Sequence, residues 1–196
     1  MASETQIGKL ALQHIGDRYD IADLTEESVE AEQVNLIFDD TRDWLLRQHT
    51  WGFAKKFANP ASLTGTVPNN YDYMYTYMTD AVRVNQVVDP LGLNTKIDFE
   101  IARNSSDKKV ILTDQSDAEF IYTAQITNTA EFDPEFVIAF SYALAAKLAI
   151  PLTGDREIAN DMAVLAERTI TAAQTTDSNE GVADEAPDAD WITARA

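Results

Sequence analysis

The sequence predicts an α+β protein, mainly an α-helical bundle with an inserted small antiparallel β-sheet and an extended acidic C-terminal tail. Apolar residues recur every three to four positions in residues 4–49 and 134–175, which is typical of amphipathic helices. Between about residues 60 and 130 the period falls to two, as in half-buried strands. The last 20 residues hold six acidic residues against one arginine. We expect residues 1–176 to form one domain and residues 177–196 a flexible tail.

Two helices are expected in the first 50 residues. In residues 4–15 one face is apolar, and Gly16 ends the helix. Residues 26–49 follow, with Asp23 or Thr25 as the N-cap and acidic residues in the first turn. The core side of this second helix comprises Ala31, Val34, Phe38 and Leu45, and its opposite side is mostly charged. It is the most regular helix that the sequence predicts.

The middle of the chain predicts strands joined by tight turns. Tyrosines alternate with other residues from Tyr71 to Tyr77, which gives a strand with one aromatic face. We expect this face to cover the helical bundle or a neighbouring subunit, although an aromatic face also stacks on sugars. Further strands are expected at residues 82–88, 97–101, 109–113 and 119–126, with turns at residues 89–92 and 104–107.

Two more helices are expected after the strands. The first covers residues 134–150, with Asp133 as N-cap and Pro134 in the first turn. It is rich in alanine, which permits close approach of a neighbouring helix. The segment from Pro151 to Gly154 is expected to break the chain, and residues 155–175 form the last helix.

Composition excludes several classes of protein. There is no cysteine, so disulfide frameworks and thiolate metal sites are excluded. The 33 acidic residues outnumber the 15 basic ones, giving a net charge of −18, and no basic cluster suited to nucleic acid is present. The longest apolar stretch, residues 136–152, contains Lys147 and is predicted to be a buried core helix. We expect no membrane span, signal peptide, cofactor or metal.

No recognisable catalytic motif is present in the sequence. The two histidines, His14 and His49, are expected in solvent or at helix C-termini rather than in a catalytic site. Pairs of carboxylates could hydrolyse polysaccharides, but with 33 carboxylates such pairs arise by chance. We therefore expect a protein that is not an enzyme. The acidic tail carries Trp191 and Ile192 near its end, which is typical either of a segment that orders on a partner or of a solubilising tail.

Several stretches, in this order, resemble the tail tubular protein A family of tailed-bacteriophage head-to-tail adaptors. They are residues 10–16 (LALQHIG), 38–46 (FDDTRDWLL), 51–54 (WGFA), 71–73 (YDY), 132–136 (FDPEF) and 148–153 (LAIPLT). The resemblance covers about residues 5–175. The strand insertion is of variable design in such proteins, and the acidic C-terminal segment has no residue-level match.

The resemblance implies a ring, commonly of twelve copies, at the head-to-tail interface of a virion assembled in the host cytoplasm. One side of the ring would bind the portal protein and the other the tail nozzle or next tail ring, with DNA passing through an acidic lumen without specific binding. Trp191 and Ile192 are our candidates for portal binding. Our candidates for subunit packing are Trp44, Trp51, Phe140 and Tyr142. The alternatives are a tail-associated polysaccharide hydrolase and a non-phage acidic interaction domain.

Overall fold

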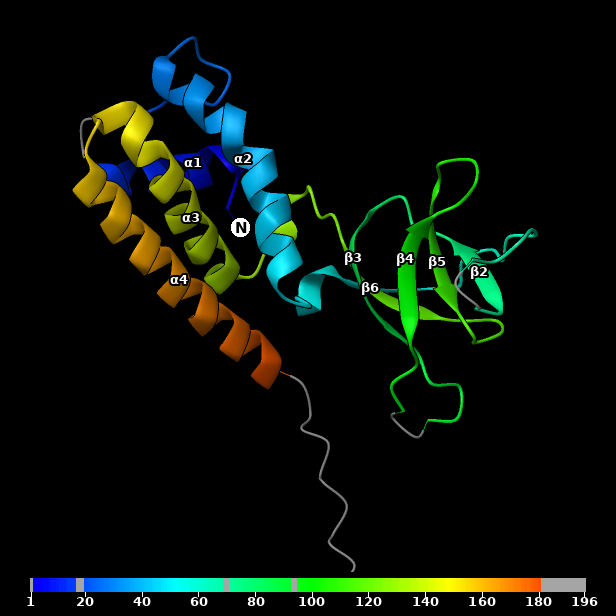
Figure 1. Cartoon of the computed structure of the whole chain (residues 1–196). Coiled ribbons are helices and arrows are strands. Elements are labelled where there is room, and N and C mark those ends of the chain that lie inside the picture. Colours follow the sequence, from blue (N-terminus) through cyan, green and yellow to red (C-terminus); the bar gives the residue numbers. More distant parts are fainter. Residues whose placement is uncertain (1, 17–19, 69–70, 93–94, 181–196) are drawn as a thin grey trace, which may run out of the picture.

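The computed structural model describes residues 2–16, 20–68, 71–92 and 95–180, which form a helical lobe and a β lobe (Figure 1). The helical lobe contains α1 (Glu4–Ile15), α2 (Val29–Gln48), α3 (Pro134–Thr153) and α4 (Arg156–Asn179). The β lobe contains β1 (Lys55–Ala58), β2 (Tyr73–Thr76), β3 (Ala81–Val87), β4 (Phe99–Arg103), β5 (Lys109–Thr113) and β6 (Phe120–Ala124). Short 3-10 helices, Gly52–Ala54 and Thr129–Glu131, lie on the two connections between the lobes. The predicted α+β class is confirmed.

Helix α3 is the centre of the helical lobe, because it packs against α1, α2 and α4. Its buried side chains include Phe136, Phe140, Leu144 and Leu148, and buried alanines let α4 lie close beside it (Figure 1). By length and composition alone α3 is apolar enough to cross a membrane, yet most of it is buried within the lobe. This burial agrees with the expectation of a core helix.

The start of α2 and the end of α3 differ from the predicted boundaries. Ser28, rather than Asp23 or Thr25, caps α2, with its hydroxyl accepting a hydrogen bond from the Ala31 N–H at 3.2 Å. Helix α3 continues through Pro151 to Thr153. Proline removes only one N–H from the last turn, and the left-handed Gly154 then ends the helix by donating its N–H to the Ile150 carbonyl.

The β lobe consists of two three-stranded antiparallel sheets, not the single sheet that was predicted. Their strand orders are β1-β6-β3 and β2-β5-β4. Tyr75 of β2 pairs with Ile111 of β5, and its ring lies edge-on to Phe120 of β6 at 5.5 Å. Tyr75 therefore packs between the two sheets instead of covering the helices, whereas Tyr73 on the same face is 36% exposed. The opposite face of β2 and β5 forms a small separate core of Met74, Val110 and Leu112.

The predicted turns are present and explain how the strands reverse. In the first, the Gly92 N–H donates to the Asp89 carbonyl at 3.1 Å, and Gly92 has a φ of +65°. In the second, the Asp107 N–H donates to the Asn104 carbonyl at 2.9 Å, and Asp107 has a φ of 58°. The second turn joins β4 to β5 as an antiparallel hairpin.

Candidate functional site

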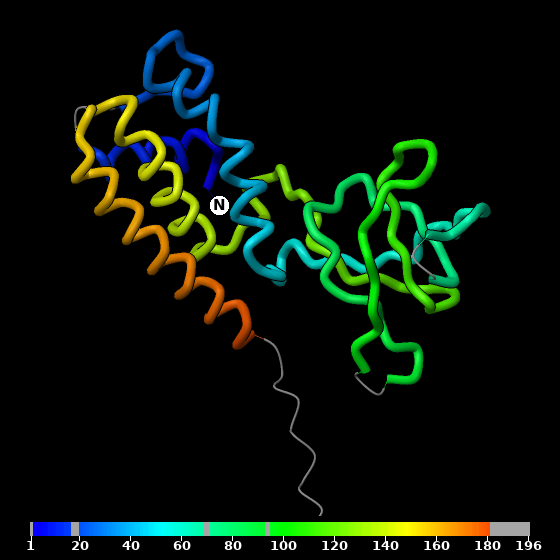
Figure 2. Tube along the Cα trace, in the orientation of Figure 1, coloured from blue at the N-terminus to red at the C-terminus, as the bar shows by residue number. Residues whose placement is uncertain are grey.

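The two lobes meet where the chain leaves α2 and where it returns to α3 (Figure 2). Trp51 fills this junction and is only 1% exposed. Its indole N–H donates to the Leu45 carbonyl at 3.1 Å, and its ring lies edge-on to Phe136 of α3 at 5.0 Å. A large aromatic side chain from the connection is thus locked into the core of the helical lobe, which fixes the point from which the β lobe extends.

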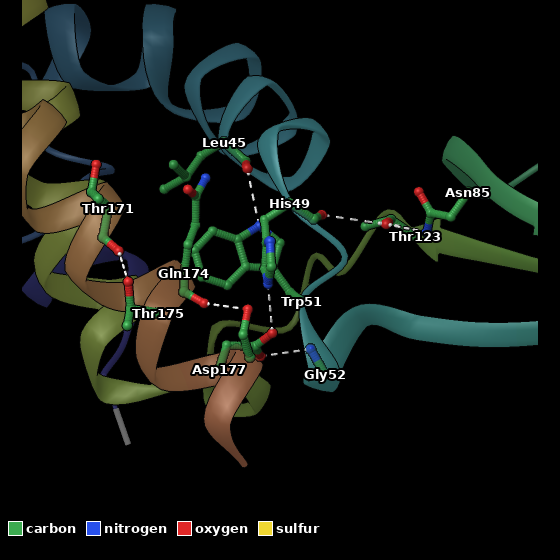
Figure 3. Close-up of polar contacts among 11 residues, drawn as sticks. Leu45, His49, Trp51, Gly52, Asn85, Thr123, Thr171, Gln174, Thr175 and Asp177 are labelled. Carbon is green, nitrogen blue, oxygen red and sulfur yellow. Dashed lines mark hydrogen bonds and ion pairs between the residues drawn. The ribbon is translucent and has the colours of Figure 1, made fainter. Parts of the chain in front are cut away.

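A series of polar contacts continues from this point into the β lobe (Figure 3). The Asp177 carboxylate, near the end of α4, accepts the Gly52 N–H at 2.7 Å and lies 2.9 Å from His49 Nε2. The His49 carbonyl accepts the Thr123 hydroxyl of β6 at 3.5 Å, and that hydroxyl accepts the Asn85 amide of β3 at 3.0 Å. These contacts link α4 to the central strand β6 and the edge strand β3 of one sheet.

Side chains of α2 add further links between the lobes. The Arg47 guanidinium donates to the Val82 carbonyl at 2.7 Å, and the Arg83 guanidinium donates to the Arg47 carbonyl at 3.3 Å. The Gln125 amide donates to the Asp43 carboxylate at 2.6 Å. These bonds join the end of α2 to two segments of the β lobe, strand β3 and the residue that follows β6. They therefore hold the β lobe in one orientation relative to the helices.

The predicted start of the acidic tail, at Asp177, is wrong. Asp177 was expected to be the first residue of a flexible segment, but α4 continues to Asn179 and the Asp177 side chain is nearly buried. The polar residues of this last stretch fit a helix because their hydroxyls bond to backbone carbonyls one turn earlier. Such bonds join Thr171 to Glu167, Thr175 to Thr171 and Ser178 to Gln174.

Of the four aromatic residues predicted to pack subunits together, two are core residues of the protomer. Trp51 and Phe140 have almost no exposed surface, so they cannot directly contact another copy in this structure. Tyr142 is half-buried and stacks on the His14 ring, with 3.9 Å between ring centres. Trp44 is 45% exposed and is therefore the one of the four that offers a large outer surface. The predicted portal contacts, Trp191 and Ile192, lie outside the described residues.

The histidines also occupy different surroundings from those expected. His14 is in the last turn of α1, where the helix dipole favours a proton, but it lies against α3 with Nε2 at 3.1 Å from the Ser141 hydroxyl. Partial burial lowers the pKa of His14 below its usual value of 6.5. His49 does end α2, as predicted, and there it contacts Asp177 rather than only solvent.

An exposed apolar stripe runs along α2 on the side opposite the core. We define the α2 stripe as Val29, Leu36 and Trp44, which are 63%, 70% and 45% exposed. Their spacing of seven and eight residues places them on one helical face. Exposed carboxylates of Glu32 and Asp40 flank Leu36 by one turn on either side. Large apolar side chains in a charged frame are typical of a protein-binding surface.

Sequence reasoning missed Val29 and Leu36 as surface candidates, although a signal was present. Both are large apolar residues on the otherwise charged side of an amphipathic helix. Asp177 had no comparable signal, because its partners His49 and Gly52 are about 125 positions away in the sequence.

Neither the protein families nor the curated proteins with which the chain was compared match it. Within the described residues, no group of three or more histidine and carboxylate side chains is placed to hold a metal ion. The features that the structure brings together are a hydrogen-bonded junction between the two lobes and the α2 stripe. Both are suited to holding surfaces in position.

Replacing Asp177 with alanine is expected to lower the free energy of unfolding by about 1–3 kcal/mol, because the Gly52 N–H and His49 lose their partner. Urea unfolding measures this change. Ser178→Ala is the matched control in the same helical turn, since its hydroxyl bonds only within α4, and its effect should stay within about 0.5 kcal/mol. Equal effects of the two substitutions would show that the carboxylate does not brace the junction.

The pH dependence of stability should report the burial of His14. Because the folded state lowers the pKa of His14, the unfolded chain binds more protons below pH 6.5, so stability falls as the pH drops through that value towards the folded pKa. His14→Phe keeps an aromatic ring against Tyr142 and cannot take up the proton. Its unfolding free energy, compared with that of the unsubstituted protein at pH 7.5 and pH 5, should fall less. Equal decreases in the two proteins would contradict a lowered pKa of His14 in the folded state.

Proposed function

We propose that this protein is a structural adaptor of a tailed-bacteriophage virion. Twelve copies would form a ring that joins the portal to the tail nozzle or next tail ring and surrounds part of the DNA ejection channel. The resemblance of the ordered motifs in residues 5–175 to head-to-tail adaptors supports this proposal, as does the arrangement of a helical lobe with an inserted β lobe.

The main support for the proposal is the α2 stripe, together with a junction between the lobes that hydrogen bonds hold in place. A subunit of a ring needs a surface for its neighbour and a rigid body that repeats the same angle at every contact. The α2 stripe offers large apolar side chains, and the contacts of Trp51, Asp177 and Arg47 fix one lobe against the other. Neither feature depends on a bound ligand.

The acidic surface fits a passage for DNA. The whole chain carries a net charge of −18, because its 33 acidic residues outnumber its 15 basic ones. A lumen of that sign repels phosphates, which reduces adhesion of DNA during packaging and ejection. Under this proposal the protein resides in the virion and carries out no catalysis.

Electron microscopy of the full-length protein mixed with its portal tests the proposal. A ring-shaped density stacked on the portal is expected, with the same protein present in purified particles. Deleting residues 181–196 should remove portal binding and leave a folded protein, because this deletion spares the Asp177 contacts. Absence of the protein from virions, or failure to bind any portal, would refute the assignment. Portal binding that survives the deletion would refute only the role of Trp191 and Ile192.

A further inference from the structure

A groove on the β lobe carries a charge opposite to that of most of the molecule. It has a volume of about 490 Å³ and lies between the end of α2 and strands β3 and β4. Strands β3 and β4 are edge strands of the two sheets, so the groove opens where the sheets diverge. We call this the β3–β4 groove, and its principal lining residues are Arg47, Arg83, Lys109, Tyr77, Phe99 and Ile101. One carboxylate, Glu100, also lines it.

The three cations of the β3–β4 groove are held in place by groups other than carboxylates. Arg47 and Arg83 donate to backbone carbonyls, and the Lys109 ammonium lies 3.7 Å from the centre of the Tyr77 ring. Within the described part of the chain none of the three forms an ion pair with Asp or Glu. Their charge is therefore available to a ligand without first breaking a salt bridge.

The chemistry of the groove specifies its ligand. Three positive groups require an anionic ligand, whereas the rings of Tyr77 and Phe99 and the exposed side chain of Ile101 require apolar or aromatic groups. An acidic peptide that also carries an aromatic residue satisfies both requirements. The chain itself contains one such segment, residues 181–196, with Asp184, Glu185, Asp188, Asp190 and Trp191.

The point at which α4 ends places this segment within reach. Asp177 holds the end of α4 against Gly52, and Gly52 follows the groove residue Arg47 by five positions, which is at most roughly 18 Å of chain. The eleven residues from Gly181 to Trp191 span at most roughly 36 Å when extended. A covalent link of this length corresponds to an effective concentration on the order of millimolar, so even weak contacts are sufficient for docking.

The electrostatics at the end of α4 also favour movement towards the groove. The pKa of Asp133 is raised by burial first, and then by the nearby carboxylates of Glu180, Asp177 and Glu135. The acidic segment therefore begins beside like charges, which repel it. The β3–β4 groove supplies charges of the opposite sign.

We propose that residues 181–196 dock into the β3–β4 groove of their own protomer. The aspartates pair with Arg47, Arg83 and Lys109, and Trp191 packs against Tyr77 and Phe99. This docking does not depend on the adaptor assignment. If that assignment is also correct, the groove keeps Trp191 and Ile192 covered until the portal competes for them.

A distance measurement between two spin labels in the full-length chain tests this docking. Because the chain has no cysteine, Ser105→Cys and Thr193→Cys provide two unique labelling sites, one in the turn between β4 and β5 and one in the C-terminal segment. A short and narrow distance distribution is expected. Dilution of the doubly labelled protein with unlabelled protein should leave it unchanged, because both labels belong to one chain.

Two charge reversals and added salt test whether the β3–β4 groove is the site that binds the C-terminal segment. Lys109→Glu should abolish the short distance, whereas Lys108→Glu, with the same change of charge next to the groove, should preserve it. Salt at 1 M, which reduces the screening length to about 3 Å, should broaden the distribution. A broad distribution in the unsubstituted protein, a short distance lost on spin dilution, or equal effects of the two reversals would overturn the proposal. Because spin dilution separates contacts within one chain from contacts between copies, neither result depends on ring assembly.

Discussion

Replacing Trp51 with alanine is expected to lower the free energy of unfolding by about 3–5 kcal/mol. The side chain is 1% exposed and contacts Phe136, Phe53 and His49 through its ring. Truncation leaves a cavity between the connection and α3 and removes the donor that satisfies the Leu45 carbonyl. Urea unfolding followed by circular dichroism measures the change.

Two matched variants separate the contributions at Trp51. Trp51→Phe retains a ring beside Phe136 but loses the indole N–H, so its cost should be well below that of alanine. Trp44→Ala removes the same type of side chain from an exposed position, and it should cost about 1 kcal/mol or less. If Trp44→Ala were as damaging as Trp51→Ala, the assignment of one tryptophan to the core and the other to the surface would be wrong.

The elements that the sequence predicts best are those whose ends are determined locally. Residues 4–15 form α1 as predicted, because Ser3 and Gln6 make a capping box at one end and Gly16 follows the other. Strand β5 also matches its predicted residues, 109–113. The error at Pro151 has a local cause too, since a proline in the last turn removes a single donor while Gly154 sets the actual end.

The division into two sheets could not be predicted, because it depends on pairing between distant strands. Strand β6 pairs with β1 and β3, whereas β5 pairs with β2 and β4. Among these pairs only β4 and β5 are consecutive in the sequence. Periodicity shows which side chains share a face and not which partner a strand chooses. Strand β1 was not predicted, since Lys55, Lys56 and Phe57 are all exposed and show no alternation.

The candidate surfaces also depend on tertiary contacts that the sequence does not reveal. Sequence reasoning identified the aromatic residues but could not distinguish an aromatic core from an aromatic interface. Trp51 and Trp44 are both in the neighbourhood of α2, and only the fold places one against α3 and the other outside. Asp177 likewise stabilises the junction by contacts with His49 and Gly52, which lie about 125 positions earlier in the sequence.

If the protein forms the proposed ring, replacing Leu36 with lysine is expected to stop ring assembly while leaving the protomer folded. Leu36 is 70% exposed at the centre of the α2 stripe, so a charge there would have to be buried when a second copy covers it. Loss of one central contact of this kind weakens association by 2 kcal/mol or more, which is roughly 30-fold or greater per contact. Mass photometry and electron microscopy of the variant measure the loss of rings.

The choice of lysine makes protomer stability and assembly change in opposite directions. Glu32 and Asp40 lie one turn before and one turn after position 36, so a lysine gains two favourable i,i+4 pairs worth about 0.2–0.5 kcal/mol each. The melting temperature of the protomer should therefore stay the same or rise. Leu91→Lys, at a residue 76% exposed in a turn of the β lobe, is the control and should assemble normally. Intact rings with Leu36→Lys would exclude the α2 stripe as a subunit contact, whereas loss of rings in both variants would indicate a general effect of added charge.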